Sequence, residues 1–346
     1  MKKVDQGKIV IVRNKTQLEE LREQFNTIAQ ASFFIQQQRN NVQAKSGFLS
    51  KKQKKVWSEN RARKKEDIGS WEMDDFKREQ DNYDATLETV KNRAARFMKI
   101  KVLETAYLPS YLFSPSDIVI VVGQDGLVAN TAKYARNIPI IAINPEPHRF
   151  DGILLPFTLQ NFERALQKTV SGKHQYKEVT MAEALLDDGQ SLLAFNDLYI
   201  GVNSHISAKY QITYGGSTEN QSSSGMIVST GAGATGWMSS VFNMVKGINQ
   251  LFGESPQVTA PSLPWDTNRL LFTVREPFAS KTAQAGIVSG FIEEGEELVI
   301  ESMMPQNGVI FSDGIQSDYL RFNSGSIARI GLASQKAQLV VFKTVH

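Results

Sequence analysis

Short apolar runs alternate with amphipathic segments over the first half of the chain. The runs are rich in β-branched residues, as is typical of strands, and they cover residues 8–13, 99–103, 118–122 and 138–143. Apolar residues recur at helical spacing over 18–28, 71–97, 127–136 and 159–170, with Asn14 or Thr16 placed to cap the first helix. Residues 118–122 are apolar throughout, which favours strands buried on both faces of a parallel sheet. The alternation predicts an α/β domain with a Rossmann-like, doubly wound parallel sheet.

The second half has a different pattern, with short strands of alternating polarity between turns rich in Gly, Ser and Asn. These strands cover residues 198–202, 209–214, 270–274 and 298–301. We therefore expect two domains, an α/β domain over 1–172 and an all-β, sandwich-like domain over 173–346 whose C-terminal segment packs back on the first. The polar segment 171–174 is interpreted as the linker between them.

Charge is concentrated in one segment. Residues 51–65 hold eight Lys/Arg and one Glu, so the formal net charge of +3 leaves about −4 for the remainder of the chain. A basic insertion at about 40–70 is thus expected to form a helical arm or a dimer contact, with an anionic partner as the alternative. A nucleic-acid-binding surface over the whole protein is not expected.

No apolar run is long enough to cross a membrane, and the N-terminus has no signal-peptide pattern. The absence of cysteine fits a reducing compartment, so we expect a cytoplasmic protein. We also expect a homo-oligomer, most simply a dimer.

The first candidate for chemistry is Gly123-Gln124-Asp125-Gly126, between the strand at 118–122 and the helix that follows. Open α/β sheets bind ligands where parallel strands end, and glycines beside a helix N-terminus let a phosphate approach free N–H groups. A carboxylate there would accept a proton from an attacking hydroxyl or hold a magnesium ion. An ordinary Asp-Gly turn is the competing interpretation. Asn144 ends the next strand, and we add it to the candidates.

A second candidate is the segment 222–237, in which an apolar strand leads into glycine, small residues and hydroxyls. Hydroxyl and free N–H groups can bind ribose and phosphate oxygens, and Trp237 offers a ring face for a base. The candidate binding residues are Thr230, Gly233, Thr235, Gly236, Trp237 and Ser240, and a flexible linker is the alternative. The third candidate, Asn196-Asp197, would suit a ribose diol or a base edge, although such a pair is also common at strand entry.

Other common sites are not indicated. The four histidines are scattered through the sequence, so neither a catalytic triad nor a zinc site is supported, and we predict no metal-binding residues. The GxxxxGK[ST] and GxGxxG phosphate-binding patterns are also missing.

In their order, the three segments resemble the NAD kinase family, with its Gly-Gly-Asp-Gly loop, Asn-Glu or Asn-Asp pair and Gly/Ser/Thr loop ending in an aromatic residue. The mitochondrial-type branch, within the superfamily that includes diacylglycerol kinase-like enzymes, is the more similar one, at 143–152, 194–201 and 274–279. Phe311-Ser312-Asp313-Gly314 is a further match. The resemblance covers roughly Lys8 to Phe342.

The resemblance implies transfer of the γ-phosphoryl group of ATP, with Mg²⁺, to the 2′-hydroxyl of the adenosine ribose of NAD, which makes NADP. Asp125 would be the base, Gly123 and Gly126 would frame the phosphates, and Asn196 and Asp197 would hold the nucleotide. Thr235, Gly236, Trp237 and Ser240 would line the base and ribose pocket.

Three residues differ from the family pattern. Gln124 stands where the family has its second glycine, Leu127 stands where threonine is usual, and Ser224 replaces an aspartate that most members carry. The first two changes remove backbone freedom and a hydroxyl beside the phosphates. A related kinase acting on another nucleotide, sugar or lipid alcohol and a non-catalytic nucleotide-binding protein therefore stay as alternatives.

Overall fold

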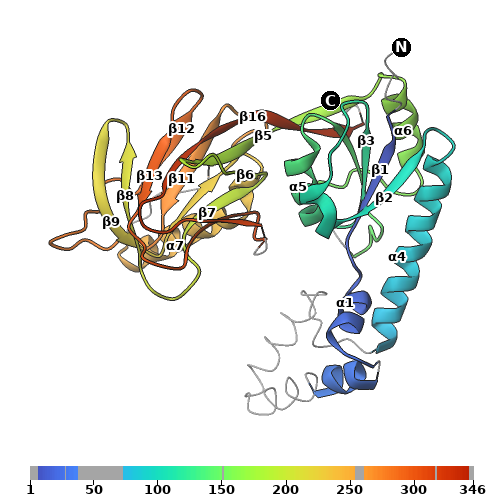
Figure 1. Ribbon diagram of the computed structural model, residues 1–346, viewed down its shortest axis with the longest axis horizontal. Helices are drawn as coiled ribbons and strands as arrows, with labels where there is room; N and C mark the ends of the chain where they lie inside the picture. The colour runs from blue at the N-terminus through green and yellow to red at the C-terminus, as the bar shows by residue number, and fades with distance from the viewer. Residues whose placement is uncertain are drawn as a thin grey trace.

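The N-terminal domain is a parallel sheet covered by helices on both faces (Figure 1). The computed structural model describes residues 7–27, 29–37, 73–149, 152–253, 261–315 and 318–342. The first four strands pair in parallel in the order β2-β1-β3-β4, and they are β1 (Ile9–Arg13), β2 (Ile100–Glu104), β3 (Ile118–Val122) and β4 (Pro139–Ile143). The helices are α1 (Gln17–Gln24), α4 (Met73–Ala94), α5 (Asp125–Ala135) and α6 (Phe162–Val170), with a 3₁₀ helix, η2 (Thr105–Ser110), and residues 29–37 are also helical. The predicted doubly wound α/β fold is confirmed.

Two apolar layers fix this arrangement. The strands are apolar on both faces, so each face needs a helical cover. Ile9, Ile11 and Ile120 pack against α4 and α6, whereas Val10 and Val121 on the other face pack against α5. α1 starts at a capping box: the Thr16 hydroxyl accepts a hydrogen bond from the Glu19 N–H (3.2 Å), and the Glu19 carboxylate accepts one from the Thr16 N–H (2.8 Å).

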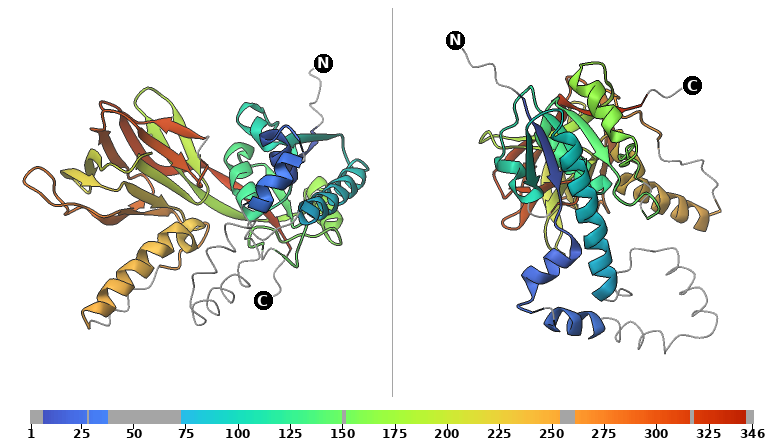
Figure 2. Two further views of the ribbon diagram at one scale, coloured as in Figure 1. Left: turned by 90° about the horizontal axis from the view of Figure 1, so that it is seen from below. Right: turned by 90° about the vertical axis from the view of Figure 1, so that its right-hand side faces the viewer.

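The C-terminal domain is a sandwich of antiparallel strands around one apolar core, as predicted. A six-stranded sheet has the order β12-β11-β10-β7-β14-β15 and faces strands of a larger sheet that includes β16-β13-β8-β9. The strands are β5 (Gln175–Leu186), β6 (Ser191–Ala194), β7 (Asp197–Val202), β8 (Ala208–Tyr214), β9 (Ser217–Ser223), β10 (Met226–Ser229), β11 (Arg269–Val274), β12 (Ser289–Glu293), β13 (Leu298–Ser302), β14 (Gly308–Ser312), β15 (Tyr319–Arg321) and β16 (Ile327–Val341). The remaining helices are η3 (Gly233–Thr235) and α7 (Trp237–Leu251), and α7 projects from the domain in both views of Figure 2.

Two long strands, β5 and β16, run from one domain into the other (Figure 1). At one end β16 pairs antiparallel with β13, and at the other its Gln338 and Leu339 pair in parallel with β4. β5 pairs with β16 along nearly its whole length, with an irregularity between Leu332 and Lys336. The ten-stranded sheet is thus continuous through both domains, and the segment 171–174 is a short turn before β5 rather than a link between separate sheets.

The basic insertion predicted at about residues 40–70 lies outside the described residues. Among the residues that are described, no helix is long and apolar enough to cross a membrane.

Candidate functional site

Asp125 lies where β3 ends, at the carboxyl edge of the parallel sheet. It is the first residue of α5, after Gln124 at the N-cap, and its acidic side chain is favourable in the first turn of a helix. Asn144 lies beside it at the end of β4, because Val122 pairs with Ile143 and the Gly123 N–H donates to the Ile143 carbonyl (3.3 Å). The adjacent ends of two strands therefore bring the first candidate loop and Asn144 together.

The Asp125 carboxylate binds the backbone of the loop that follows β4. One oxygen accepts a hydrogen bond from the Leu154 N–H (2.8 Å), and the other accepts one from the Ile153 N–H (3.1 Å). Gly152 precedes them with φ +63°, and a Cβ there would lie 2.7 Å from the Asn144 side-chain nitrogen. Two donors thus fix the orientation of the carboxylate. Each of its oxygens keeps a further lone pair for another donor.

Leu127 explains why glycine is needed at position 123. The Leu127 side chain is buried, and a Cβ on Gly123 would come 2.8 Å from its Cδ2 atom. In contrast, nothing lies within 4 Å of a Cβ built on Gly126, which is exposed. The leucine that departs from the family pattern therefore packs against the loop, and the side of the loop at Gly126 is open to a ligand.

Hydrogen bonds join Asn196, Asp197, Thr230 and Gly233 into one cluster around Asp313 (the Asp313 cluster). The Asp313 carboxylate accepts hydrogen bonds from the N–H groups of Phe195 (3.1 Å), Asn196 (2.6 Å) and Asp197 (3.3 Å). Thr230 donates its hydroxyl to the Phe195 carbonyl (2.6 Å) and accepts from the Gly233 N–H (3.2 Å). A Cβ on Gly233 would lie 2.0 Å from the Asn196 carbonyl oxygen, so this approach requires glycine. The second and third candidate segments thus pack directly together.

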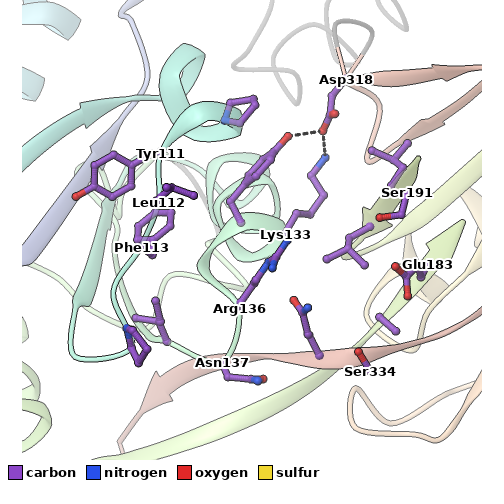
Figure 3. Close-up of a pocket in the computed structure, with 18 residues that line it drawn as sticks. Tyr111, Leu112, Phe113, Lys133, Arg136, Asn137, Glu183, Ser191, Asp318 and Ser334 are labelled. Atoms are coloured by element: carbon purple, nitrogen blue, oxygen red, sulfur yellow. Dashed lines mark hydrogen bonds and ion pairs between the residues drawn. The ribbon is translucent and has the colours of Figure 1, made fainter. Parts of the chain in front are cut away.

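Lys133 links the Asp313 cluster to the helix that starts at Asp125. Its ammonium group donates to Ser312 Oγ (2.8 Å) and Asp318 Oδ2 (2.8 Å), and it lies 3.7 Å from Asp313 Oδ2. Figure 3 shows Lys133 reaching from α5 to Asp318, which also accepts the Tyr134 hydroxyl (2.8 Å). The Lys133 side chain is only 2% exposed, and its charge is balanced by the carboxylates of the C-terminal domain.

Burial is the main cause of the pKa shifts in the Asp313 cluster. Burial first, and then the nearby Asp313 carboxyl, raise the pKa of the Asp197 carboxyl to about 7. Burial also raises the pKa of Asp313, while Lys133 and the three backbone N–H groups act in the opposite direction. An Asp197 carboxyl with this pKa can change its charge near neutral pH.

The end of the second candidate segment exposes hydroxyls beside an aromatic stack. Thr235, Gly236 and Ser240 are exposed around the start of α7. Trp237 is half-buried and lies parallel to Tyr199, with ring centroids 5.7 Å apart and an interplanar angle of 11°. The Arg275 guanidinium lies 5.3 Å from the Trp237 ring centroid. These neighbours already occupy part of the Trp237 surface that sequence reasoning offered to a base.

One apolar cluster brings the predicted segments together. Leu127 from α5, Leu154 from the Asp125-bound loop and Phe195 belong to it, and Ala232 packs against it. Sequence reasoning missed the roles of Lys133, Asp318 and the backbone of Ile153 and Leu154. The Ser312-Asp313-Gly314 match was a usable signal for Asp313, whereas a single lysine on a helix gave no indication of its buried partners.

Comparisons with known proteins find similarity to NAD and NADH kinases. No protein-family profile matches the chain. A probable NADH kinase of Oryza sativa subsp. japonica is 25% identical over 222 residues, which are 57% of this chain and 63% of that protein. An NAD kinase of Saccharolobus islandicus is 28% identical over 145 residues, 42% of this chain and 56% of that protein. The match thus spans less than two thirds of the length of these relatives.

Solved structures share the fold. Yeast NADH kinase complexed with NADH has a TM-score of 0.53 at 12% identity, with 98% of this chain and 85% of that chain covered. An NAD kinase from Archaeoglobus fulgidus in complex with ATP has a TM-score of 0.51 at 16% identity, with 73% and 88% covered. The two-domain architecture is therefore common to these proteins.

Proposed function

We propose that this chain, whose sequence and fold are those of an NAD kinase family member, transfers the γ-phosphoryl group of ATP to the 2′-hydroxyl of the adenosine ribose of NAD or NADH. The observation that carries the proposal is the place of Asp125, a fixed carboxylate at the carboxyl edge of the sheet, next to an open glycine and a helix N-terminus. The other two candidate segments pack on the same apolar cluster. This combination suits phosphoryl transfer, which depends mainly on positioning and charge neutralisation.

Asp125 is proposed as the proton acceptor. The N–H groups of Ile153 and Leu154 hold the carboxylate in one orientation, and its remaining lone pairs can accept the hydroxyl proton. Free N–H groups at the start of α5 would bind phosphate oxygens, which can approach over Gly126.

The other candidates are proposed to bind the nucleotide. Asn144 lies beside the Asp125 loop. The segments that hold Asn196, Asp197, Thr230 and Gly233 pack on the same apolar cluster as that loop. The exposed hydroxyls of Thr235 and Ser240 are available to ribose or phosphate oxygens, next to Gly236 and Trp237.

Mg²⁺ is expected to arrive with ATP. Magnesium is usually held by phosphate oxygens and one or two carboxylates, with water completing the octahedron. Within the described residues, no group of three or more His or acidic side chains could hold a metal by itself. An ion that the phosphates carry needs no dedicated cluster of protein ligands, and it would neutralise the phosphate charge.

A coupled assay of NADP or NADPH formation with ATP, magnesium and either NAD or NADH tests the proposal on the full chain. We expect the Asp125→Asn enzyme to lose about 10²–10⁴-fold in kcat, since the proton acceptor is removed. The matched control is Asp74→Asn, which removes the charge of a side chain that is 91% exposed in the first turn of α4. The control enzyme should retain the wild-type rate.

KM values separate catalysis from loop anchoring at Asp125. The amide group introduced by Asp125→Asn would face one of the two N–H donors and loosen the loop at 152–154, so a purely anchoring Asp125 would raise KM with kcat nearly unchanged. Formation of NADP at the wild-type rate by Asp125→Asn would refute the role of base. If the wild-type protein binds nucleotide without turnover, the non-catalytic alternative replaces the proposal.

We also propose a homo-oligomer, placed in the cytoplasm, with domains at 1–172 and 173–346. Apolar residues on the projecting half of α7 support self-association: Met244, Ile248 and Leu251 are 47%, 50% and 80% exposed. Ile248→Glu combined with Leu251→Glu should then reduce the mass measured by light scattering to that of the monomer. A wild-type mass of 38.6 kDa would exclude the oligomer.

A further inference from the structure

A cavity lies between the two domains, at the far end of α5 from Asp125. Its volume is about 590 Å³, and it is lined by the last turn of α5, the loop before β3 and parts of β5, β6 and β16. Asp125 begins α5, and Lys133 is eight residues later, about 12 Å along the axis at 1.5 Å per residue. None of the residues predicted for phosphoryl transfer lines the cavity, so it is separate from the proposed catalytic site.

One wall of this cavity is aromatic and apolar. Tyr111 and Phe113 come from the loop before β3, and their rings meet edge to face with centroids 4.7 Å apart. Leu112 between them is 91% exposed, which is unusual for a leucine beside two aromatic rings. Figure 3 shows these three residues together on one side of the cavity. Such a wall suits the face of a planar ring.

The opposite wall and the floor carry polar groups that can receive a ligand. Arg136 directly follows α5 and is exposed, and its guanidinium group has no hydrogen bond or ion pair with other described residues. The carboxylate of Glu183, on β5, likewise has no such partner in the described part of the chain. Gln335 Oε1 is buried without a hydrogen-bond donor among the described residues, which is an unfavourable state that a ligand donor would relieve. Figure 3 shows Arg136 between the aromatic wall and Glu183.

These groups define the chemistry of a ligand. Arg136 can bind an anionic group, and Glu183 and Gln335 can accept hydrogen bonds from hydroxyl or amino groups. The aromatic wall can pack against a ring. The cavity could hold on the order of 20 water molecules at about 30 Å³ each, and hence a ligand with a similar number of non-hydrogen atoms. That size exceeds an amino acid or a free phosphate and suits a nucleoside monophosphate.

We propose that the cavity between the domains is a second ligand site, which binds a nucleoside monophosphate with its phosphate at Arg136, its ring on the wall of Tyr111 and Phe113, and its amino or hydroxyl groups at Glu183 and Gln335. The site does not depend on the proposed kinase activity. Its ligand can bind while the proposed catalytic site at the other end of α5 is occupied.

Calorimetric titration of the full chain with AMP tests the site. We expect Arg136→Met to weaken AMP binding to this site at least tenfold, because the phosphate loses its only unpaired cation among the described lining residues. The matched control, Arg164→Met, removes an exposed arginine from α6 and should leave the affinity unchanged. Adenosine and inorganic phosphate should each bind at least tenfold more weakly than AMP, and adenosine should not distinguish Arg136→Met from the wild type.

A second variant keeps the proposal testable if Arg136→Met fails to fold. Ser191 is an exposed residue of β6 on the cavity wall, and Ser191→Trp would fill the cavity without removing a buried contact. It should abolish AMP binding to this site, whereas Asp125→Asn should leave that binding intact. Equal AMP affinity in the wild type and both cavity variants, no binding at millimolar AMP, or loss of binding in Asp125→Asn alone would overturn the proposal. These results do not depend on NADP formation.

Discussion

Replacement of Lys133 by methionine should destabilise the protein by about 3 kcal/mol. Methionine has a similar length, but it removes the ammonium group that contacts Ser312, Asp313 and Asp318 at 2.8, 3.7 and 2.8 Å. Removal of one member of a buried ion pair typically costs about 3–5 kcal/mol, because a charge stays buried without its partner. The lower end applies here, since Asp318 is 22% exposed and Asp313 keeps three N–H donors.

Urea denaturation monitored by tryptophan fluorescence measures the loss as a shift of the midpoint at constant m-value. The matched control is Lys336→Met, which breaks a 3.7 Å ion pair with Glu178 whose side chains are 34% and 43% exposed. Such a surface pair contributes about 0–1 kcal/mol, so the control should lose far less stability. A second variant that also carries Asp318→Asn should recover part of the loss, since one unpaired charge is removed.

Acidic pH gives an independent test of the same reasoning. Burial raises the pKa of Asp313, and once Lys133 is gone protonation of Asp313 relieves the penalty, so the difference from the wild type should shrink as the pH falls from 7 to 5. Two results would refute the assignment of this lysine as the charge partner of the Asp313 cluster. One is a free energy of unfolding for Lys133→Met within about 1 kcal/mol of the wild type at pH 7, and the other is a loss of stability that grows on acidification.

Three further predictions concern single residues. Burial raises the pKa of Asp197 to about 7, so the stability from its neutral form is complete below about pH 4 and is lost as the pH rises through 7. Asp197→Asn should remove up to about 4 kcal/mol of that pH dependence. The same change of urea midpoint between pH 5 and 8 in the variant and the wild type would contradict it. Gly233→Ala should cost about 1–3 kcal/mol because its Cβ meets the Asn196 carbonyl, whereas Gly247→Ala in open space on α7 should gain up to about 1 kcal/mol; equal thermal midpoints would refute the contrast. Thr16→Ala should cost about 1 kcal/mol through its capping box, measured in the same melts, and an unchanged midpoint would count against it.

Local pattern was sufficient for strands β1 to β4 of the parallel sheet and for the place of Asp125 at the end of β3. A continuous β-branched run such as 118–122 has few structural alternatives, and its end marks the carboxyl edge of the sheet. Helix starts were less accurate. α6 begins at Phe162 rather than near 159, because the side chains of Thr158 and Asn161 bond to backbone N–H groups and form a turn first.

Long-range features could not be predicted from local pattern. The burial of Lys133 depends on Ser312, Asp313 and Asp318, which are about 180 residues away in sequence. The continuity of the sheet depends in the same way on an irregularity in β16 that carries one strand from the sandwich to β4. The resemblance to a family indicated which segments meet, whereas the contacts that join them became visible only in three dimensions.

The strand β16 also has a consequence for folding during synthesis. β4 pairs through Ile140 with Leu339, so one edge of the N-terminal sheet stays open until about 200 further residues have left the ribosome. An open edge of buried-type strands is a template for pairing with another chain, and contacts this distant in sequence form slowly. The nascent N-terminal half should therefore depend on chaperones or on rapid completion of the chain, and expression of that half alone should give aggregates rather than a folded domain.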